Sequence, residues 1–76
     1  MIRIGDTILA VGTKFRSSTF SAVAEVSVIK DDGIEVIMIP SDGICFRHFF
    51  SKHQIKDGFT NGIFWVPPVE PQYHIV

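Results

Sequence analysis

Residues 22–39 read AVAEVSVIKDDGIEVIMI and decide the fold, because two runs rich in β-branched residues flank an Asp-Gly step. Asp-Gly accepts the positive φ angles of a tight hairpin turn. If Asp32-Gly33 is a two-residue turn, Lys30 lies across from Glu35 and Val26 across from Ile39. The stretch therefore predicts two antiparallel strands, and the sequence on both sides extends them into a meander.

Two further steps, Asp42-Gly43 and Asn61-Gly62, also lie between apolar runs and predict turns. No window of twelve residues carries a helical stripe, and Ser51–Lys56 predicts a single 3₁₀ turn. Short strands with almost no helix indicate an all-β barrel or sandwich. The predicted strands are Ile2–Val11, Ala22–Lys30, Ile34–Ile39, Ile44–Phe50 and Ile63–Val66.

The two-residue turns assign the strand residues to two faces of the sheet. One face is the predicted core: Ala22, Ala24, Val26, Val28, Ile37, Ile39, Phe46 and Phe50. A three-residue bulged loop would shift the pairing by one residue and swap the faces, so this alternative stays open. The opposite face carries four apolar residues: Ile29, Val36, Met38 and Phe49. They predict either a second core layer, covered by the N-terminal strand, the tail or barrel curvature, or an interface with a partner.

This order of elements resembles an SH3-like barrel. The matching features are a first strand with Ile4-Gly5-Asp6, a long loop over Gly12–Ser21, a three-stranded meander, a short turn near Ser51–Asp57 and a last strand. Gly5-Asp6 followed by Ala22–Val26 is similar to KOW-type modules. The resemblance extends to about Pro67 and implies a small five-stranded barrel. It implies little about function, since such barrels host many unrelated activities.

The chain has 76 residues, which predicts one β-domain over residues 1–66 followed by an extended, proline-rich tail over 67–76. A domain this short buries only about 60% of its unfolded surface. The composition is nevertheless 46% hydrophobic and only 20% charged. This excess of apolar residues favours a homo-oligomer or an obligate protein partner.

Charge and cysteine content narrow the function classes. The net charge is −1, whereas domains that bind nucleic acid through phosphates are usually basic. Cys45 is the single cysteine, so no disulfide can form within the chain, which fits a reducing cytoplasm. No apolar signal region and no run of about 18 apolar residues is present, so we expect a cytoplasmic protein without a membrane segment.

Catalytic and metal-binding patterns are weak in this sequence. The acids Asp31, Asp32, Asp42 and Asp57 lie at predicted turns, where aspartate caps the local backbone, and no nucleophile or phosphate-binding motif is present. Cys45-x2-His48-x4-His53 has metal-ligand spacing, but strand alternation puts Cys45 and His48 on opposite faces. We therefore expect a protein that is not an enzyme and has neither a metal nor a cofactor.

Basic and aromatic residues alternate in two acid-free segments, residues 12–21 and 43–56. If these segments pack together, they form a basic-aromatic patch that suits single-stranded nucleic acid, an acidic protein or a phosphorylated ligand. In the alternative, the phenylalanines fill the core and the charges are solvated. The predicted basic-aromatic patch is Lys14, Phe15, Arg16, Phe20, Arg47, Phe49, Lys52, His53 and Lys56.

Three functions remain open at this point. The first is a small adaptor or inhibitor that acts through protein–protein contacts, a kind of protein common in phages and mobile elements. The second is a nucleic-acid-binding module that uses the basic-aromatic patch, with a strong salt dependence. The third is an oligomer that captures a small anionic ligand between subunits. The absence of catalytic motifs and the apolar excess favour the first.

Overall fold

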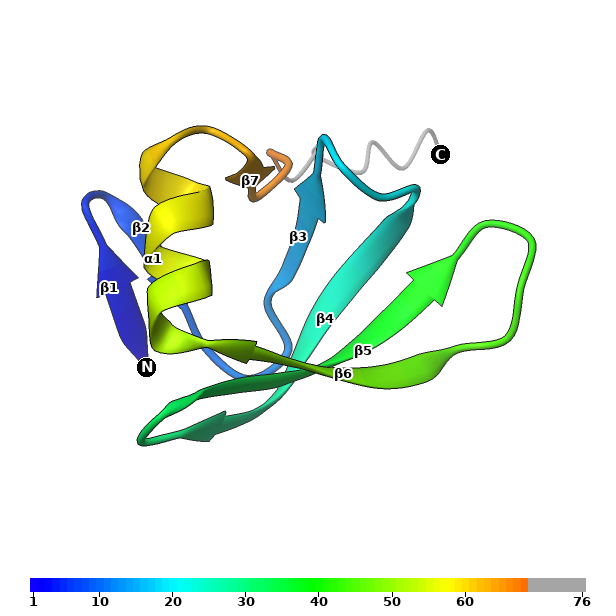
Figure 1. The fold of residues 1–76 in the computed structure, drawn as a ribbon, viewed down its shortest axis with the longest axis horizontal. Coiled ribbons are helices and arrows are strands. Elements are labelled where there is room, and N and C mark those ends of the chain that lie inside the picture. The colour runs from blue at the N-terminus through cyan, green and yellow to red at the C-terminus, as the bar shows by residue number, and fades with distance from the viewer. Residues whose placement is uncertain (69–76) are drawn as a thin grey trace, which may run out of the picture.

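The computed structural model of the chain describes residues 1–68 and is mostly β (Figure 1). A five-stranded antiparallel sheet has the order β6-β5-β4-β3-β7, and β1 and β2 form a separate hairpin. The elements are β1 (Ile2–Ile4), β2 (Thr7–Leu9), β3 (Lys14–Ser17), β4 (Ala22–Lys30), β5 (Gly33–Pro40), β6 (Phe46–Ser51), α1 (Lys52–Thr60) and β7 (Phe64–Trp65). The predicted all-β character and the antiparallel meander are confirmed.

Helix α1 and the β1–β2 hairpin lie together at one end of the strongly twisted sheet, while β4, β5 and β6 extend toward the other end (Figure 1). The core fills the space between these elements. Its buried members are Leu9, Phe15, Ala24, Val26, Ile34, Val36, Met38, Phe50, Ile55 and Phe64. Within residues 1–68, β6 and β7 each pair on one side only, so closure into an SH3-like barrel stays a prediction.

The turn between β4 and β5 differs from the predicted one. Asp31 and Asp32 form it, so Lys30 pairs with Gly33 rather than with Glu35. Gly33 is the first residue of β5, and its φ angle is not positive. A Cβ at this position would lie 2.2 Å from the carbonyl oxygen of Phe50. Gly33 is therefore required by the close approach of β6 and not by the turn.

A β-bulge between Val26 and Val28 corrects the predicted faces. The displaced turn alone would place Val26 across from Ile37, and the extra residue of the bulge places it across from Val36. Past the bulge, Ile29 rather than Val28 turns toward the core. Because strand side chains alternate, one extra residue in β4 changes which residues of β5 share a face with Ala24 and Val26. The even-numbered residues of β5 now lie on the core face, instead of the predicted odd-numbered ones.

Burial shows the result for each predicted core residue. Ala24, Val26 and Phe50 are buried and Ala22 is half-buried against the core, as predicted. Val28 and Phe46 are exposed, and Ile37 and Ile39 are half-buried on the outer face, the face of the sheet turned away from the core. Their core positions on β5 are taken by Ile34, Val36 and Met38. The β5–β6 connection spans residues 41–45 and pairs Phe46 with Met38 rather than with Ile39, one residue from the predicted register.

The predicted 3₁₀ turn at Ser51–Lys56 is wrong, because this segment begins a nine-residue α-helix, Lys52–Thr60. Ser51 is its N-cap: the Ser51 Oγ accepts the Gln54 N–H over 3.1 Å, and the Gln54 Oε1 accepts the Ser51 N–H over 2.9 Å. This reciprocal capping box satisfies two N–H groups that would otherwise lack partners. Ile55 and Gly58 form the buried side of the helix.

Asn61-Gly62 ends this helix instead of joining two strands. The Asn61 N–H donates to the Asp57 carbonyl over 3.0 Å, and the Ile63 N–H donates to the Gly58 carbonyl over 2.8 Å. Gly62 has a φ of +73°, which is favourable for glycine just past a helix end. The chain then enters β7, which pairs with β3. Pro67 and Pro68 lie outside any strand, and the rest of the predicted tail, 69–76, lies outside the described residues.

Removal of the N-cap gives a first testable prediction. We expect Ser51→Ala to lower the free energy of unfolding by about 1 kcal/mol, because the Gln54 N–H loses its acceptor. Urea unfolding followed by circular dichroism measures the change. Ser41→Ala, in the β5–β6 connection, is the matched control and should change stability by less than about 0.5 kcal/mol. Equal effects of the two substitutions would contradict the role of the cap.

Candidate binding groove between β1 and α1

The phenylalanines of the predicted basic-aromatic patch lie mainly in the core. Phe15 is fully buried, with its ring centroid 5.4 Å from those of Phe59 and Phe64 and 6.0 Å from that of Phe50. Phe20 is half-buried and packs against the same cluster. Phe15 therefore belongs to the core and cannot contact a ligand at the surface.

Lys14, Arg16, Arg47 and Phe49 do share one surface, the outer face of the sheet. Two carboxylates lie among them. Glu25 is 4.0 Å from the Lys14 ammonium, and Glu35 is 3.7 Å from the Arg47 guanidinium and 3.4 Å from the Lys30 ammonium. The outer face is therefore a mixed-charge surface.

The predicted apolar interface of Ile29, Val36, Met38 and Phe49 does not form one surface. Val36 and Met38 are buried in the core, and Ile29 is half-buried against it. Phe49 is 40% exposed on the outer face. The β4 bulge explains the difference, because it turns the even-numbered residues of β5 inward.

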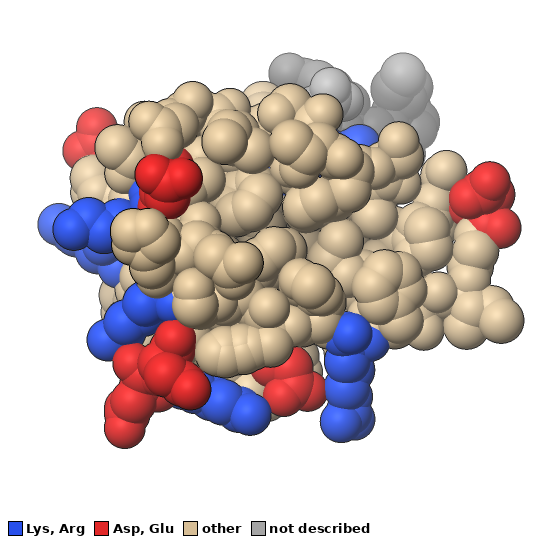
Figure 2. Space-filling view, in the orientation of Figure 1, with Lys and Arg blue, Asp and Glu red and all other residues tan. Residues whose placement is uncertain are grey.

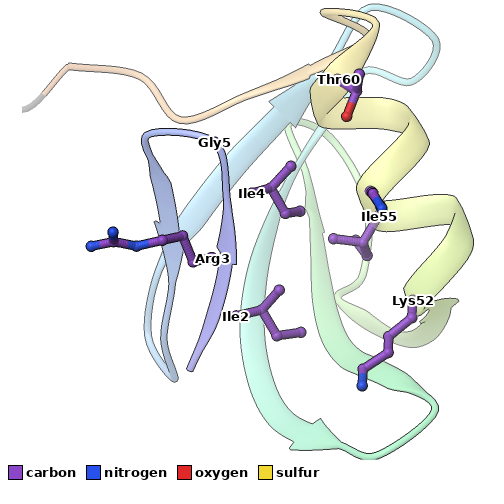
Figure 3. Close-up of a pocket in the computed structure, with 8 residues that line it drawn as sticks. Ile2, Arg3, Ile4, Gly5, Lys52, Ile55 and Thr60 are labelled. Atoms are coloured by element: carbon purple, nitrogen blue, oxygen red, sulfur yellow. The ribbon is translucent and has the colours of Figure 1, made fainter.

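The remaining patch residues, Lys52, His53 and Lys56, are exposed on α1. Lys52 and Lys56 are one helical turn apart and flank the buried Ile55. They form one wall of a groove of about 320 Å³ between β1 and α1, here called the β1–α1 groove (Figure 3). Its lining residues are Ile2, Arg3, Ile4, Gly5, Lys52, Ile55, Lys56 and Thr60.

The floor of the β1–α1 groove is apolar. Ile2 and Ile4 point from β1 toward Ile55 of α1 in Figure 3. Strand alternation places Ile2 and Ile4 on the same side of β1, and both are half-buried against the core. Ile55 is fully buried beneath them. Apolar side chains that enter this groove would therefore meet a floor continuous with the core.

The other wall of the β1–α1 groove is the backbone of β1. Arg3 lines the groove, yet its side chain points away from it (Figure 3), and Gly5 has no side chain to contribute. At Arg3 and Gly5, the backbone of β1 therefore lines the groove. Among residues 1–68, β1 pairs with β2 and with no other strand, so one edge of β1 is free. Gly5, with a φ of +58°, makes the tight turn to β2 that holds β1 in this position.

The charge of the β1–α1 groove is positive. Within residues 1–68, its lining contains lysine and arginine but neither aspartate nor glutamate. Figure 2 shows Lys and Arg side chains at the left end of the molecule, where α1 and the β1–β2 hairpin lie, with acidic side chains among them. The Lys52 N–H donates to the Asp32 carbonyl over 3.0 Å, which fixes the start of α1 against the β4–β5 turn.

Lys52 and Lys56 are predicted as binding residues from the sequence, but the groove that they line is not. The sequence predicts a strand at Ile2, Arg3 and Ile4 with no binding role, and a 3₁₀ turn at the two lysines. The signal that could have revealed the helix is the capping box, Ser51 followed by Gln54 three residues later. With a helix assigned, the spacing of Lys52 and Lys56 places them on one face.

The Cys45-x2-His48-x4-His53 pattern does not form a metal site in the described part of the chain. Cys45 is exposed in the β5–β6 connection, and the His48 ring lies edge-on to Phe50 with centroids 4.6 Å apart. Over residues 1–68, no three His, Cys, Asp or Glu side chains are arranged to hold a metal ion. The described part of the chain also contains no helix long and apolar enough to cross a membrane.

No protein-family model, curated protein or solved structure matches the chain, so the geometry of the β1–α1 groove carries the functional argument.

Proposed function

We propose that the chain is a protein-binding module that takes an extended segment of a partner protein into the β1–α1 groove. The observation that carries the proposal is the juxtaposition of a free strand edge with an apolar floor and a lysine wall. A free edge and a surface for alternate side chains are the elements by which a protein recognises an added β-strand, and the lysines add a preference for charge.

The free edge of β1 supplies the backbone contacts. A strand edge presents unpaired N–H and C=O groups, and an extended peptide can satisfy them by pairing alongside. An extended segment seated in the β1–α1 groove would lie along β1, where Arg3 and Gly5 contribute main chain to the lining. Backbone pairing gives affinity for any extended segment, so specificity must come from the floor and the helix wall.

The floor and the wall select the side chains of the segment. In an added strand, alternate side chains point to the same side. One set would pack on Ile2 and Ile4, which favours apolar residues. The lysines of α1 favour acidic residues on the segment, since no carboxylate of the lining competes for them. The expected ligand is therefore an extended segment with both apolar and acidic residues.

The outer face offers less support for the nucleic-acid alternative. Its cations Lys14 and Arg47 are each close to a carboxylate, and a phosphate backbone would approach Glu25 and Glu35 as well. Strong binding through phosphates depends on uncompensated cations along the path of the strand. The β1–α1 groove presents such cations, but beside an apolar floor suited to side chains.

A peptide selection tests the proposal. Random 12-residue peptides displayed on phage are selected on the immobilised chain, and the enriched peptides are measured by fluorescence anisotropy. We expect enriched sequences that combine apolar and acidic residues. The double variant Lys52→Glu/Lys56→Glu should weaken their binding about tenfold or more, because attraction at the rim becomes repulsion.

The matched control is Lys14→Glu/Arg16→Glu, which changes the net charge equally but alters the outer face. It should leave peptide affinity within about twofold. Equal losses in the two double variants would mean that net charge alone governs binding. Enrichment of basic peptides, or stronger binding of a single-stranded oligonucleotide than of any peptide, would overturn the proposal.

A further inference from the structure

The outer edge of β6 is a second free strand edge, in a different sheet from β1. Among residues 1–68, β6 pairs with β5 and with no other strand, and it forms one border of the sheet (Figure 1). Natural edge strands are usually protected by lysines, prolines, bulges or a covering element. The ladder between β5 and β6 is regular, without a bulge. Phe46 and Phe49 of β6 are 53% and 40% exposed.

The hydrogen-bond pattern shows which backbone groups are free on this edge. The Lys52 N–H donates to the Asp32 carbonyl, in line with the β5–β6 register. Hydrogen-bonded pairs alternate along an antiparallel ladder, so the even-numbered residues of β6 bond to β5. The N–H and C=O groups of Arg47 and Phe49 therefore point away from the sheet. The Ser51 N–H is already engaged by Gln54 Oε1 over 2.9 Å.

We propose that two copies of the chain pair through this edge, β6 against β6 in antiparallel orientation, with His48 of each copy on the two-fold axis. In this register, Arg47 lies across from the partner subunit's Phe49, and Phe49 lies across from the partner subunit's Arg47. Every free N–H and C=O of Arg47 and Phe49 then finds a partner across the interface. The two five-stranded sheets become one continuous sheet.

The neighbouring registers are less favourable. Pairing centred on Arg47 places two guanidinium groups directly opposite each other, and like charges in that position are destabilising. Pairing centred on Phe49 places Arg47 against the partner's Ser51, whose N–H is already occupied within its own chain. The register centred on His48 avoids both problems, because it juxtaposes unlike side chains at each flanking position.

The side chains on both faces of this interface are complementary to those of a second copy. On the outer face, the Arg47 side chain is 80% exposed and lies across from the partner subunit's Phe49, the arrangement of a cation–π pair. On the inner face, the exposed Phe46 lies across from the partner subunit's Phe50 and gains an aromatic contact. Self-complementarity of this kind is what a two-fold interface requires.

Register-specific disulfide capture tests the interface. All variants carry Cys45→Ser, which removes the native thiol. Residues paired at His48 would have Cα atoms about 4.5 Å apart, which suits a disulfide, whereas two Arg47 positions would be about 8–9 Å apart. We expect His48→Cys to form a covalent dimer on mild oxidation, at least tenfold faster than Arg47→Cys. Equal rates, or faster coupling of Arg47→Cys, would overturn the proposed register.

Sedimentation equilibrium tests the association without cross-linking. The unmodified chain should sediment as a dimer at micromolar concentration, and Arg47→Glu should raise the dimer dissociation constant at least tenfold. Lys30→Glu is the matched control, because it also removes an ion pair with Glu35 but lies off the β6 edge. A wild-type monomer at all concentrations, or equal weakening by both variants, would refute the interface. The β1–α1 groove is unaffected by these substitutions, so peptide binding is tested independently.

Discussion

Phe15→Ala is expected to lower the free energy of unfolding of the chain severely at 25 °C. Phe15 is fully buried, and its ring contacts those of Phe50, Phe59 and Phe64. Deletion of a buried phenylalanine ring costs about 3–5 kcal/mol, because the transfer free energy is lost and a cavity remains. A domain of 76 residues has a total stability of about 4–11 kcal/mol. The substitution therefore removes a large share of what holds the fold.

Urea unfolding followed by circular dichroism and tryptophan fluorescence measures this loss. Phe46→Ala deletes the same ring from a position that is 53% exposed, so it serves as the control. Both variants should be compared below the dissociation constant of any dimer, since Phe46 also belongs to the proposed β6 interface. We expect Phe46→Ala to cost less than about 1 kcal/mol. A cooperative Phe15→Ala transition within about 1 kcal/mol of wild type would contradict the central role of this ring.

Gly33→Ala should cost about 3 kcal/mol or more, although it adds a single methyl group. The new Cβ would lie 2.2 Å from the carbonyl oxygen of Phe50 and 2.7 Å from Cζ of Phe49. The ring of Phe49 can rotate away, but the carbonyl belongs to the backbone of β6. Relief therefore requires β5 and β6 to separate at this end, and overpacking that moves backbone is among the costlier kinds.

The thermal midpoint measures the effect of Gly33→Ala, with an expected drop of about 12 °C or more for a domain of this size. Gly43→Ala is the control: the nearest atom to its Cβ is Cγ of Pro40, at 3.1 Å, in a surface connection. Both substitutions reduce the entropy of the unfolded chain equally. A lower thermal midpoint for Gly33→Ala than for Gly43→Ala therefore reports the contact with β6. Equal midpoints would show that β5 and β6 can move apart at this end without loss of stability.

The strands of the meander follow directly from the sequence, whereas their register does not. β-branched runs around Asp31–Gly33 are sufficient to predict β4 and β5. The bulge after Val26 has no local signal, because Ser27 is as compatible with a regular strand as with an extra residue. Its cause is tertiary: Val26 and Ile29 can both pack on the core only if β4 gains a residue between them.

The capping box in the sequence indicates helix α1, but the apolar pattern of the segment does not, for a physical reason. Lys52–Thr60 contains Ile55, Gly58 and Phe59 as its apolar or small residues, too few for a long hydrophobic stripe. Its stability depends on the cap at Ser51 and on burial of Ile55 against β1, and contact with β1 is a long-range interaction. The β1–α1 groove could not be predicted for the same reason, since its two walls are about fifty residues apart in the sequence.

The β4 bulge has a further consequence for how reliably the chain finds its fold. On one side of the bulge, Val26 pairs with Val36, and on the other side Ile29 pairs with Ile34. A uniform hairpin can slide by two residues and still keep apolar side chains on one face. In this hairpin the two halves are out of step by one residue, so no single slide satisfies both. The extra residue thus allows only one register in which both halves of the hairpin bury their apolar side chains, which disfavours misaligned hairpins during folding.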